Sequence, residues 1–535
     1  YVLAIAPESL PLLQGFADRE RCPLAVVGRA TEHKALVLED GQGGERAIDM
    51  PMDVLFGKPP KMLRDVARIE RREAPLNLTG VSLEQAALDV LRHPTVASKR
   101  FLITIGDRTV GGLSHRDQMV GPWQVPVADV AVTLADFKGF AGEAMSMGER
   151  TPLASVHAPA SGRMAVAEAI TNLLAAPIEL SRVKLSCNWM AACGEPGEDA
   201  ALYDTVRAVG MELCPALGVS VPVGKDSLSM RTKWQDEGRS KQVVAPVSLI
   251  VSAFASVADV RGTRTPELAR EDSALILVDL GRGQHRMAGS VLAQTLQQFG
   301  DAVPDLDDPK LLVSLVAAVN ALRAQGLLLA YHDRSDGGLW AAACEMAFAG
   351  HTGVSLNVDM LVTEGTGIDD SRADTGDAKN WATQVGARRE ELTLKALFNE
   401  ELGALLQVPA AQRDDAIGVL RAHGLSAHSH VVGKPNDRGT VEVWRDARSV
   451  LAKSLRELQQ AWDETSWRIA QLRDNPACAD SEHALAAQAD DPGLHVALTF
   501  DPKENFAAPF LNLARPKVAI LREQGVNSHV EMSYA

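Results

Sequence analysis

The stretch GDRTVGGLSHRDQMVGPWQVPVAD, residues 106–129, stands between two apolar segments and decides how the surrounding chain folds. It follows FLITI (101–105), whose apolar pattern predicts a strand, and it leads into VPVADVAVTL (125–134), which predicts another. Its four glycines let the backbone pass close to a ligand. Several side chains offer charge to an anion or a metal: Arg108, His115, Arg116 and Asp117. The stretch therefore predicts a ligand-binding loop, with an ordinary surface connection as the alternative.

Length and composition describe a globular protein with several cores. The chain has 535 residues, and at about 100–200 residues per domain we expect three or four domains. Apolar residues make up 46% and charged residues 23%, which excludes a disordered chain. A net charge of -15 argues against nucleic acid or an anionic membrane as a general partner. Bound phosphates would therefore need Mg²⁺ or local cations.

The six cysteines show no C-x-x-C pair, which predicts a reduced, cytoplasmic protein. No apolar run reaches the length of about 18 residues that a membrane helix needs, and no signal peptide is visible at the N-terminus. The chain begins inside a strand-like segment at Tyr1 and ends inside a helix-like one at Ala535. We therefore expect it to be part of a longer polypeptide.

Changes of pattern divide the chain into six segments. Their expected bounds are 1–57, 58–80, 81–257, 258–435, 436–514 and 515–535. Helices alternate with strands through the third and fourth segments, which predicts a mixed α+β architecture. Within the fourth, the acidic and glycine-rich residues 363–389 predict an insertion that loops out.

Four polar residues interrupt apolar patterns in ways that suit a metal. Asp129 lies within an apolar strand pattern, where an aspartate either hydrogen-bonds a loop or holds a metal. The predicted helix 161–175, with Ser161 as its N-cap, places Glu168 and Asn172 on one side. A carboxylate and an amide at this spacing can ligate one hard cation, although a solvated polar face is the alternative.

The segment HDRSDGG (332–338) lies between an apolar strand pattern and an apolar helix pattern. Paired glycines at a helix start let backbone N–H groups approach a phosphate. Asp333 is then a metal-ligand candidate and Ser335 a phosphate or ribose contact, with a simple helix cap as the alternative. Lys225 in VGKDSLSM could face a phosphoryl group, but the P-loop spacing is absent. The roles of Lys225, His115 and Arg116 stay open.

Taken together, these motifs resemble one family. The loop 106–129, GEAMSMGERTP, AEAITN, KLSCNWMAACGEPGEDAALYD, VGKDSLSM, HDRSDGG with EMAFAG, FNEELG and RPKVAILREQGVNSHVEM occur in order along almost the whole chain. They closely resemble phosphoribosylformylglycinamidine synthase, the large single-chain formylglycinamide ribonucleotide amidotransferase of purine biosynthesis. The number and order of the motifs make coincidence a poor explanation.

The resemblance implies an α+β fold built from aminoimidazole ribonucleotide synthetase-like halves, followed by an α/β class I glutaminase domain. Residues 1–57 would end the first half and 58–80 would be a linker. The N-terminal and C-terminal domains of the second half would occupy 81–257 and 258–435. The rest would be a helical and polar connector, 436–514, and the start of the glutaminase domain, 515–535.

The implied activity is that of an ATP-dependent C–N ligase. It would convert formylglycinamide ribonucleotide, ATP and glutamine to formylglycinamidine ribonucleotide, ADP, phosphate and glutamate. The glutaminase cysteine would lie beyond Ala535 and most of the first half is missing, so this segment alone is not expected to use glutamine. Its implied partners are those missing parts of the same chain, with no nucleic acid and no membrane.

The resemblance also implies a Mg²⁺–nucleotide site for ATP or ADP. Asp129, Glu168, Asn172 and Asp333 would hold Mg²⁺, and Ala128 and Ser335 would contact the nucleotide. No residue of this segment is implied to be catalytic. Two roles for the site stay open: it takes part in the ATP-dependent reaction, or it holds ADP–Mg²⁺ only to stabilise the fold.

Overall fold

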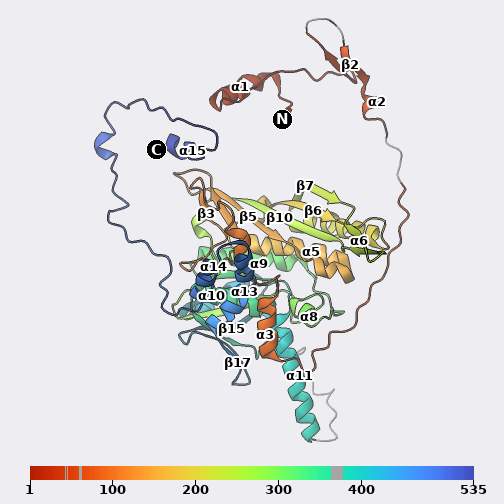
Figure 1. Cartoon of the computed structure of the whole chain (residues 1–535), viewed down its shortest axis with the longest axis vertical. Coiled ribbons are helices and arrows are strands. Elements are labelled where there is room, and N and C mark those ends of the chain that lie inside the picture. The colour runs from red at the N-terminus through yellow and green to blue at the C-terminus, as the bar shows by residue number, and fades with distance from the viewer. Residues whose placement is uncertain (42–43, 45, 59–62, 363–377) are drawn as a thin grey trace. The chain divides into compact units, whose positions relative to one another are not determined.

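The computed structural model describes the chain except residues 42–43, 45, 59–62 and 363–377, and within 378–385 it describes the backbone alone (Figure 1). Residues 59–62 of the expected linker and 363–377 of the expected insertion therefore lie outside the described residues. The chain divides into two compact units, Tyr1–Asp65 and Val66–Ala535, and the division falls within the expected linker.

The N-terminal unit is small and mostly exposed. Strands β1 (Ala35–Glu39) and β2 (Arg46–Pro51) pair antiparallel as a hairpin. The helical elements are η1 (Pro7–Ser9), α1 (Leu10–Arg19) and α2 (Met52–Leu55).

The larger unit begins with a six-stranded sheet in the order β3-β4-β5-β10-β6-β7. Neighbouring strands pair antiparallel except β6 and β7, which are parallel. The strands are β3 (Ser114–Arg116), β4 (Ala131–Leu134), β5 (Gly142–Gly148), β6 (Lys184–Met190), β7 (Ser220–Ser227) and β10 (Ser248–Val257). A separate hairpin joins β8 (Arg231–Asp236) to β9 (Arg239–Val244).

Helix α5 (Ala154–Leu173) packs on the sheet beside β5 and β10. The other helical elements of this part are α3 (Leu83–Arg92), α4 (Arg100–Ile103), η2 (Thr151–Leu153), η3 (Leu180–Arg182), α6 (Glu198–Arg207), the π-helix η4 (Ala208–Leu213), α7 (Cys214–Leu217) and η5 (Val260–Gly262). Helix α3 packs with helices of the second sheet, although it precedes the first sheet in the chain.

A seven-stranded sheet follows, in the order β12-β14-β11-β15-β13-β16-β17. Only β13 and β16 pair in parallel among its described neighbours. Its strands are β11 (Ser273–Asp279), β12 (Ala330–Arg334), β13 (Gly353–Asn357), β14 (Gly403–Pro409), β15 (Ser429–Asn436), β16 (Thr440–Arg445) and β17 (Arg448–Ser454). The boundary expected at residue 435 falls inside β15, and the sheet continues to Ser454.

Helices cover this sheet and extend beyond it. They are α8 (Val291–Thr295), α9 (Pro309–Ala324), α10 (Gly338–Gly350), α11 (Ala378–Phe398), α12 (Arg413–Ala422), α13 (Leu455–Arg473) and α14 (Pro476–Leu485), with short turns η7 (Ala410–Gln412) and η8 (Ser426–His428). Helix α11 includes residues 378–389, which we expected in a loop, so that expectation is wrong for this stretch. None of the described helices is long and apolar enough to cross a membrane.

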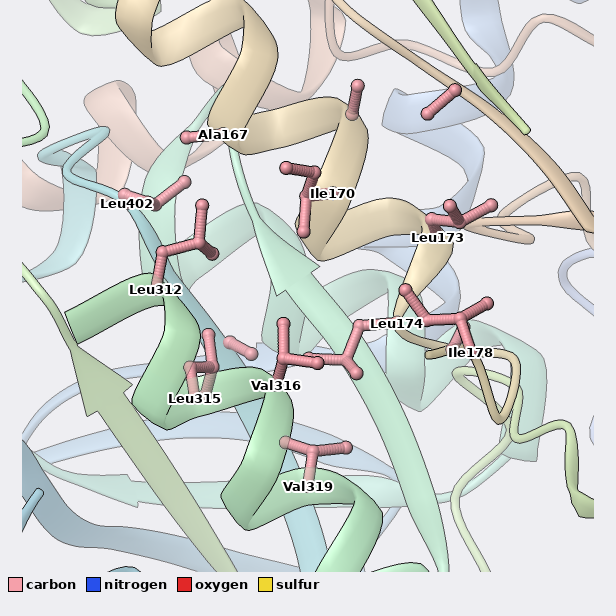
Figure 2. Packing of buried hydrophobic residues seen from close by; sticks show 14 of the residues in the cluster. Ala167, Ile170, Leu173, Leu174, Ile178, Leu312, Leu315, Val316, Val319 and Leu402 are labelled. Atoms are coloured by element: carbon pink, nitrogen blue, oxygen red, sulfur yellow. The ribbon is translucent and has the colours of Figure 1, made fainter. Parts of the chain in front are cut away.

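Two hydrophobic cores lie on opposite faces of the second sheet. Ile276 and Val278 of β11 face a core shared with α9 and α5, whereas Leu275 and Leu277 face a core shared with α3, α10 and α13. This follows from the two-residue alternation of a strand. Figure 2 shows the first core, in which Ile170 of α5 and Leu174, the residue that follows this helix, lie near the leucine and valine side chains of α9. Helix α5 is therefore buried by both parts of the larger unit.

Two local expectations are wrong. FLITI (101–105) forms no strand, since Arg100–Ile103 is the short helix α4. Ser161 is no N-cap, because α5 begins at Ala154 and bends at His157, two residues before Pro159. Ser161 is buried and donates its hydroxyl to the Arg150 carbonyl at 2.6 Å. Apolar runs of four or five residues do not distinguish strand from helix.

The C-terminal segment beyond α14 carries little regular structure. It contains η9 (Ala508–Phe510) and α15 (His529–Tyr534), and residues 515–523 form no strand. It contacts the loop between β3 and β4: the Leu494 N–H donates to the Pro122 carbonyl at 2.8 Å, and Trp123 Nε1 donates to the Asp491 carbonyl at 3.0 Å.

A buried ion pair fixes the end of β12. Arg334 Nη2 lies 2.5 Å from Asp279 Oδ1 of β11, and both residues are buried. Strand β14 runs between them, and Gly403 is opposite both residues in the register. A Cβ on Gly403 would lie 3.2 Å from Arg334 Nη2 and 2.3 Å from the Val278 carbonyl oxygen. Because residue 403 is a glycine, the Arg334 side chain can pass across β14 and reach Asp279.

We predict that Asp279→Asn lowers the free energy of unfolding by about 3 kcal/mol at pH 7, because it leaves a buried arginine unpaired. Burial disfavours the charged carboxylate, but Arg334 and the Gly283 N–H outweigh it and lower the pKa of Asp279 to about 2. The ion pair therefore stabilises the fold above the unfolded pKa of about 4, and this stabilisation is lost as pH falls toward 2.

Urea unfolding of wild type and Asp279→Asn at pH 7 and pH 3 measures this. The matched control is Asp259→Asn, whose exposed partner Arg261 also lowers the pKa of Asp259 to about 2. We expect a smaller effect there because solvent screens the pair. Equal losses in both variants would contradict the argument from burial.

Candidate functional site

The residues predicted to bind a metal meet where three elements converge. Asp129 precedes β4, Asp333 lies in β12, and Glu168 and Asn172 lie in α5. A cleft of about 250 Å³ is lined by Ala128, Asp129, Asn172, His332, Asp333 and Lys99, among others. Glu168 is buried and does not line the cleft, but its charge interacts with that of Asp333. Three of the four predicted ligands thus face one cleft, with the fourth close by.

Asp129 and Asp333 each keep one carboxylate oxygen without a hydrogen bond. Asp129 Oδ1 accepts from His332 Nδ1 at 2.7 Å and from the Asp333 N–H at 3.2 Å. Asp129 Oδ2 and Asp333 Oδ2 are buried and have no partner among the described residues. Buried carboxylate oxygens are costly unless something compensates their charge. A bound cation would supply that compensation.

Helix α5 brings two further oxygen donors to this region, of which Asn172 lines the cleft and Glu168 does not. Glu168 Oε2 accepts from the Glu149 N–H at 2.8 Å, and Asn172 Nδ2 donates to the Met147 carbonyl at 3.1 Å. Because the amide nitrogen of Asn172 faces the protein, its amide oxygen can still serve a cation. Three carboxylates and one amide oxygen form the hard donor set that Mg²⁺ prefers. The residues present therefore fit Mg²⁺.

Two acids of this region, Asp333 and Glu168, resist ionisation. Burial and the neighbouring Asp129 raise the pKa of Asp333 well above its usual value. Burial likewise raises the pKa of Glu168, although Arg150 opposes the rise. Such shifts often mark sites that bind charge, although structural ion pairs also produce them. A divalent cation would favour the ionised form of both carboxyl groups.

His332 carries the opposite charge into this cluster. Burial disfavours its protonation, but Asp129 and Glu345 outweigh burial and raise the pKa of His332 well above its usual value. Donor atoms of Asp129, His332 and Asp333 all lie within 4.8 Å of one another. The cluster therefore contains a histidine cation that partly offsets the acidic charge.

A second network, centred on Arg150, holds the turn after β12. Arg150 is buried, and its guanidinium contacts Asp336 at 3.0 Å and Glu400 at 2.9 Å. Glu400 Oε1 in turn accepts from the Gly337 N–H at 2.9 Å. Gly337 and Gly338 have φ of 79° and 66°, where a side chain would be strained. Burial raises the pKa of Asp336 to about 7 even though Arg150 lowers it.

The other predicted residues are divided between the cleft and the surface. Ala128 lines the cleft, as a nucleotide contact would, but Ser335 does not. The Ser335 carbonyl accepts the Gly338 N–H at 3.0 Å, as in a helix cap. Lys225 lies in the exposed part of β7 and donates to Ser227 Oγ at 3.0 Å. His115 and Arg116 lie in β3 and do not line the cleft.

Sequence reasoning missed three residues beside the predicted ligands: His332, Glu345 and Lys99. Glu345 is the single charge in the helix GLWAAACEMAFAG, and a lone charge in a buried helix signals a buried partner. His332 adjoins Asp333 in the quoted motif. Lys99 donates to the carbonyls of Thr95 and Ala97, and burial lowers the pKa of Lys99. No sequence pattern marks Lys99.

Two family models match successive parts of the chain. Residues 98–256 match the FGAR-AT PurM N-like domain, and residues 270–446 match the C-terminal domain of AIR synthase related proteins. Together with the two sheets, these matches define a two-domain unit with the fold of the AIR synthase related proteins. The N-terminal domain of this unit matches the version found in FGAR-AT proteins.

Solved structures with similar chains include Thermotoga maritima PurL complexed with FGAR and Escherichia coli HypE, a hydrogenase maturation protein. The first is 12% identical, covers 70% of this chain and 53% of that chain, and has a TM-score of 0.48. The second is 15% identical, covers 59% and 84%, and has a TM-score of 0.39. This chain thus spans about half the length of the PurL structure. The fold assignment rests on the family models and the sheets.

We predict that Arg150→Gln lowers the free energy of unfolding by about 3–5 kcal/mol, because it leaves Glu400 and Asp336 without their buried counter-charge. The control is Arg163→Gln, which removes the Asp305 ion pair; the Arg163 side chain is 20% exposed, against 4% for Arg150. Denaturant unfolding at pH 7 measures both variants. A loss at Arg150 no larger than that at Arg163 would contradict the buried network.

Proposed function

We propose that this two-domain unit holds a Mg²⁺–nucleotide complex. Asp129, Glu168, Asn172 and Asp333 would hold Mg²⁺, and Ala128 and Ser335 would contact ATP or ADP. The observation that carries the proposal is the pair of buried, unpartnered oxygens, Asp129 Oδ2 and Asp333 Oδ2. When bound, Mg²⁺ would neutralise phosphate charge that the acidic protein would otherwise repel.

The chain's own residues would fix the position of the complex. Glu168 is buried on α5, and Ala128 lines the cleft in which the complex would be held. Ser335 belongs to the turn that precedes α10, where Glu400 fixes the Gly337 N–H.

We further propose that the unit is part of an enzyme of purine biosynthesis. That enzyme would convert formylglycinamide ribonucleotide, ATP and glutamine to formylglycinamidine ribonucleotide, ADP, phosphate and glutamate. The match of residues 98–256 to an FGAR-AT domain supports this assignment. As an ATP-dependent ligase linked to a glutaminase, the enzyme would need a first synthetase-like half and a glutaminase domain in addition to this unit.

A second role for the same site is structural: ADP–Mg²⁺ would stabilise the fold without taking part in the reaction. The burial of the acidic cluster favours this alternative, because a cation held there offsets buried charge whether or not ATP is consumed. Asp333→Asn in the complete amidotransferase separates the two roles. Loss of activity at an unchanged Tm supports catalysis, whereas a large fall in Tm supports the structural role.

We predict that the chain binds ADP more tightly with Mg²⁺ than without it, and that Asp333→Asn weakens the Mg²⁺-dependent binding by at least ~10-fold, because it removes a charged ligand. Isothermal titration calorimetry with ADP, in the presence and absence of Mg²⁺, measures this. The control is Asp301→Asn, an exposed acid of the second domain. Equal Mg²⁺ dependence in wild type and Asp333→Asn would rule out Asp333 as a ligand.

A further inference from the structure

His332 lies between two carboxylates, and neither of its ring nitrogens is available to a metal. Nδ1 lies 2.7 Å from Asp129 Oδ1, and Nε2 lies 2.8 Å from Glu345 Oε2. The side chain is 8% exposed. A ring nitrogen that donates to a carboxylate has no lone pair to offer a cation. His332 therefore contributes to the cluster of possible metal donors through its hydrogen bonds alone.

Glu345 is itself held in place from a different part of the chain. Its Oε1 accepts from Trp462 Nε1 of α13 at 3.2 Å, and the same N–H donates to the Val96 carbonyl at 2.9 Å. Both oxygens of Glu345 thus have partners, one the indole of α13 and the other His332. A series of hydrogen bonds leads from Trp462 through Glu345 and His332 to Asp129.

This series ends on one particular oxygen of Asp129. Alternation along β12 directs Tyr331 toward α5, where its hydroxyl donates to the Thr171 carbonyl at 2.7 Å, and directs His332 toward α10. Asp129 Oδ1 therefore receives the His332 ring on one side and the Asp333 N–H on the other. With Oδ1 fixed by two donors, the carboxylate cannot rotate freely, and Oδ2 keeps one orientation.

We infer that His332 and Glu345 are positioning residues, which orient Asp129 so that Oδ2 faces the bound Mg²⁺. The inference rests on the proposed function, because it assigns these residues to the same Mg²⁺–nucleotide site. Neither residue touches the metal. Histidine and carboxylate partners behind a metal ligand fix its orientation in many sites, and losing one costs about 10–100-fold in metal affinity.

The experiment measures ADP binding to the chain by calorimetry, with and without Mg²⁺, for wild type and four variants. His332→Ala removes the ring, and His332→Asn keeps an N–H donor close to the position of Nδ1. Glu345→Ala removes the support behind the ring, and the double variant His332→Ala/Glu345→Ala completes a cycle. His285→Asn is the control, since His285 is buried between Leu361 and Asn399 and does not line the cleft.

We expect His332→Ala to weaken Mg²⁺-dependent binding by about 10–100-fold and to leave metal-free ADP binding unchanged. His332→Asn should recover most of the affinity. Glu345→Ala should weaken it less, and the double variant should match His332→Ala because Glu345 acts through the ring. His285→Asn should lower Tm without changing the Mg²⁺ dependence.

Three results would overturn the inference. If His332→Ala binds Mg²⁺–ADP as tightly as wild type does, the inference is wrong and the proposed function still stands. Additive losses in the double variant would show that Glu345 acts on the metal by another route. Absence of Mg²⁺-dependent binding in wild type itself would overturn both the proposed function and the inference.

Discussion

The burial of helix α5 on two sides is the constraint on which the rest of the site depends. On one side the helix lies so close to β5 that a Cβ on Gly148 would stand 2.2 Å from the Ala165 carbonyl oxygen. On the other side Ile170 and Leu173 of the helix, with Leu174 just after it, share a core with α9 and the second sheet. A helix held this way cannot rotate to expose Glu168. The carboxylate is therefore buried, and its charge must be balanced from within.

That balance connects the two sheets. Arg150 follows β5 of the first sheet and contacts Glu400 and Asp336 of the second domain. His332 supplies another positive charge, next to Asp129 and Asp333, and Lys99 lines the same cleft. Asp129 Oδ2 and Asp333 Oδ2 still have no hydrogen-bond partner among the described residues, which is why a bound cation suits the cleft. Packing, charge balance and the proposed ligand binding thus depend on the same few residues.

The sequence predicted the α+β class and most elements with a clear period, because the spacing of apolar residues differs between a helix and a strand. It failed on FLITI, where a short apolar run folds as helix α4, and on Ser161, where Pro159 bends a longer helix instead of ending it. For the site, motif resemblance named Asp129, Glu168, Asn172 and Asp333. It did not separate Ala128, which lines the cleft, from Ser335, which does not. The difference lies in the local conformation of a turn, which the sequence of the motif does not specify.

By itself, the sequence determined which chemical groups are available: three carboxylates and an amide, set within or beside apolar strand and helix patterns. Only the tertiary structure decided which atoms of those groups remain for a ligand. Asp129 and His332 are 203 positions apart in the chain, and their hydrogen bond takes Oδ1 and leaves Oδ2. Glu168 and Asn172 share a helix face in the sequence, yet the packed sheets bury one and leave the other in the cleft. Hydrogen-bond partners and burial are set by contacts between distant segments, and the local spacing of apolar residues does not predict those contacts.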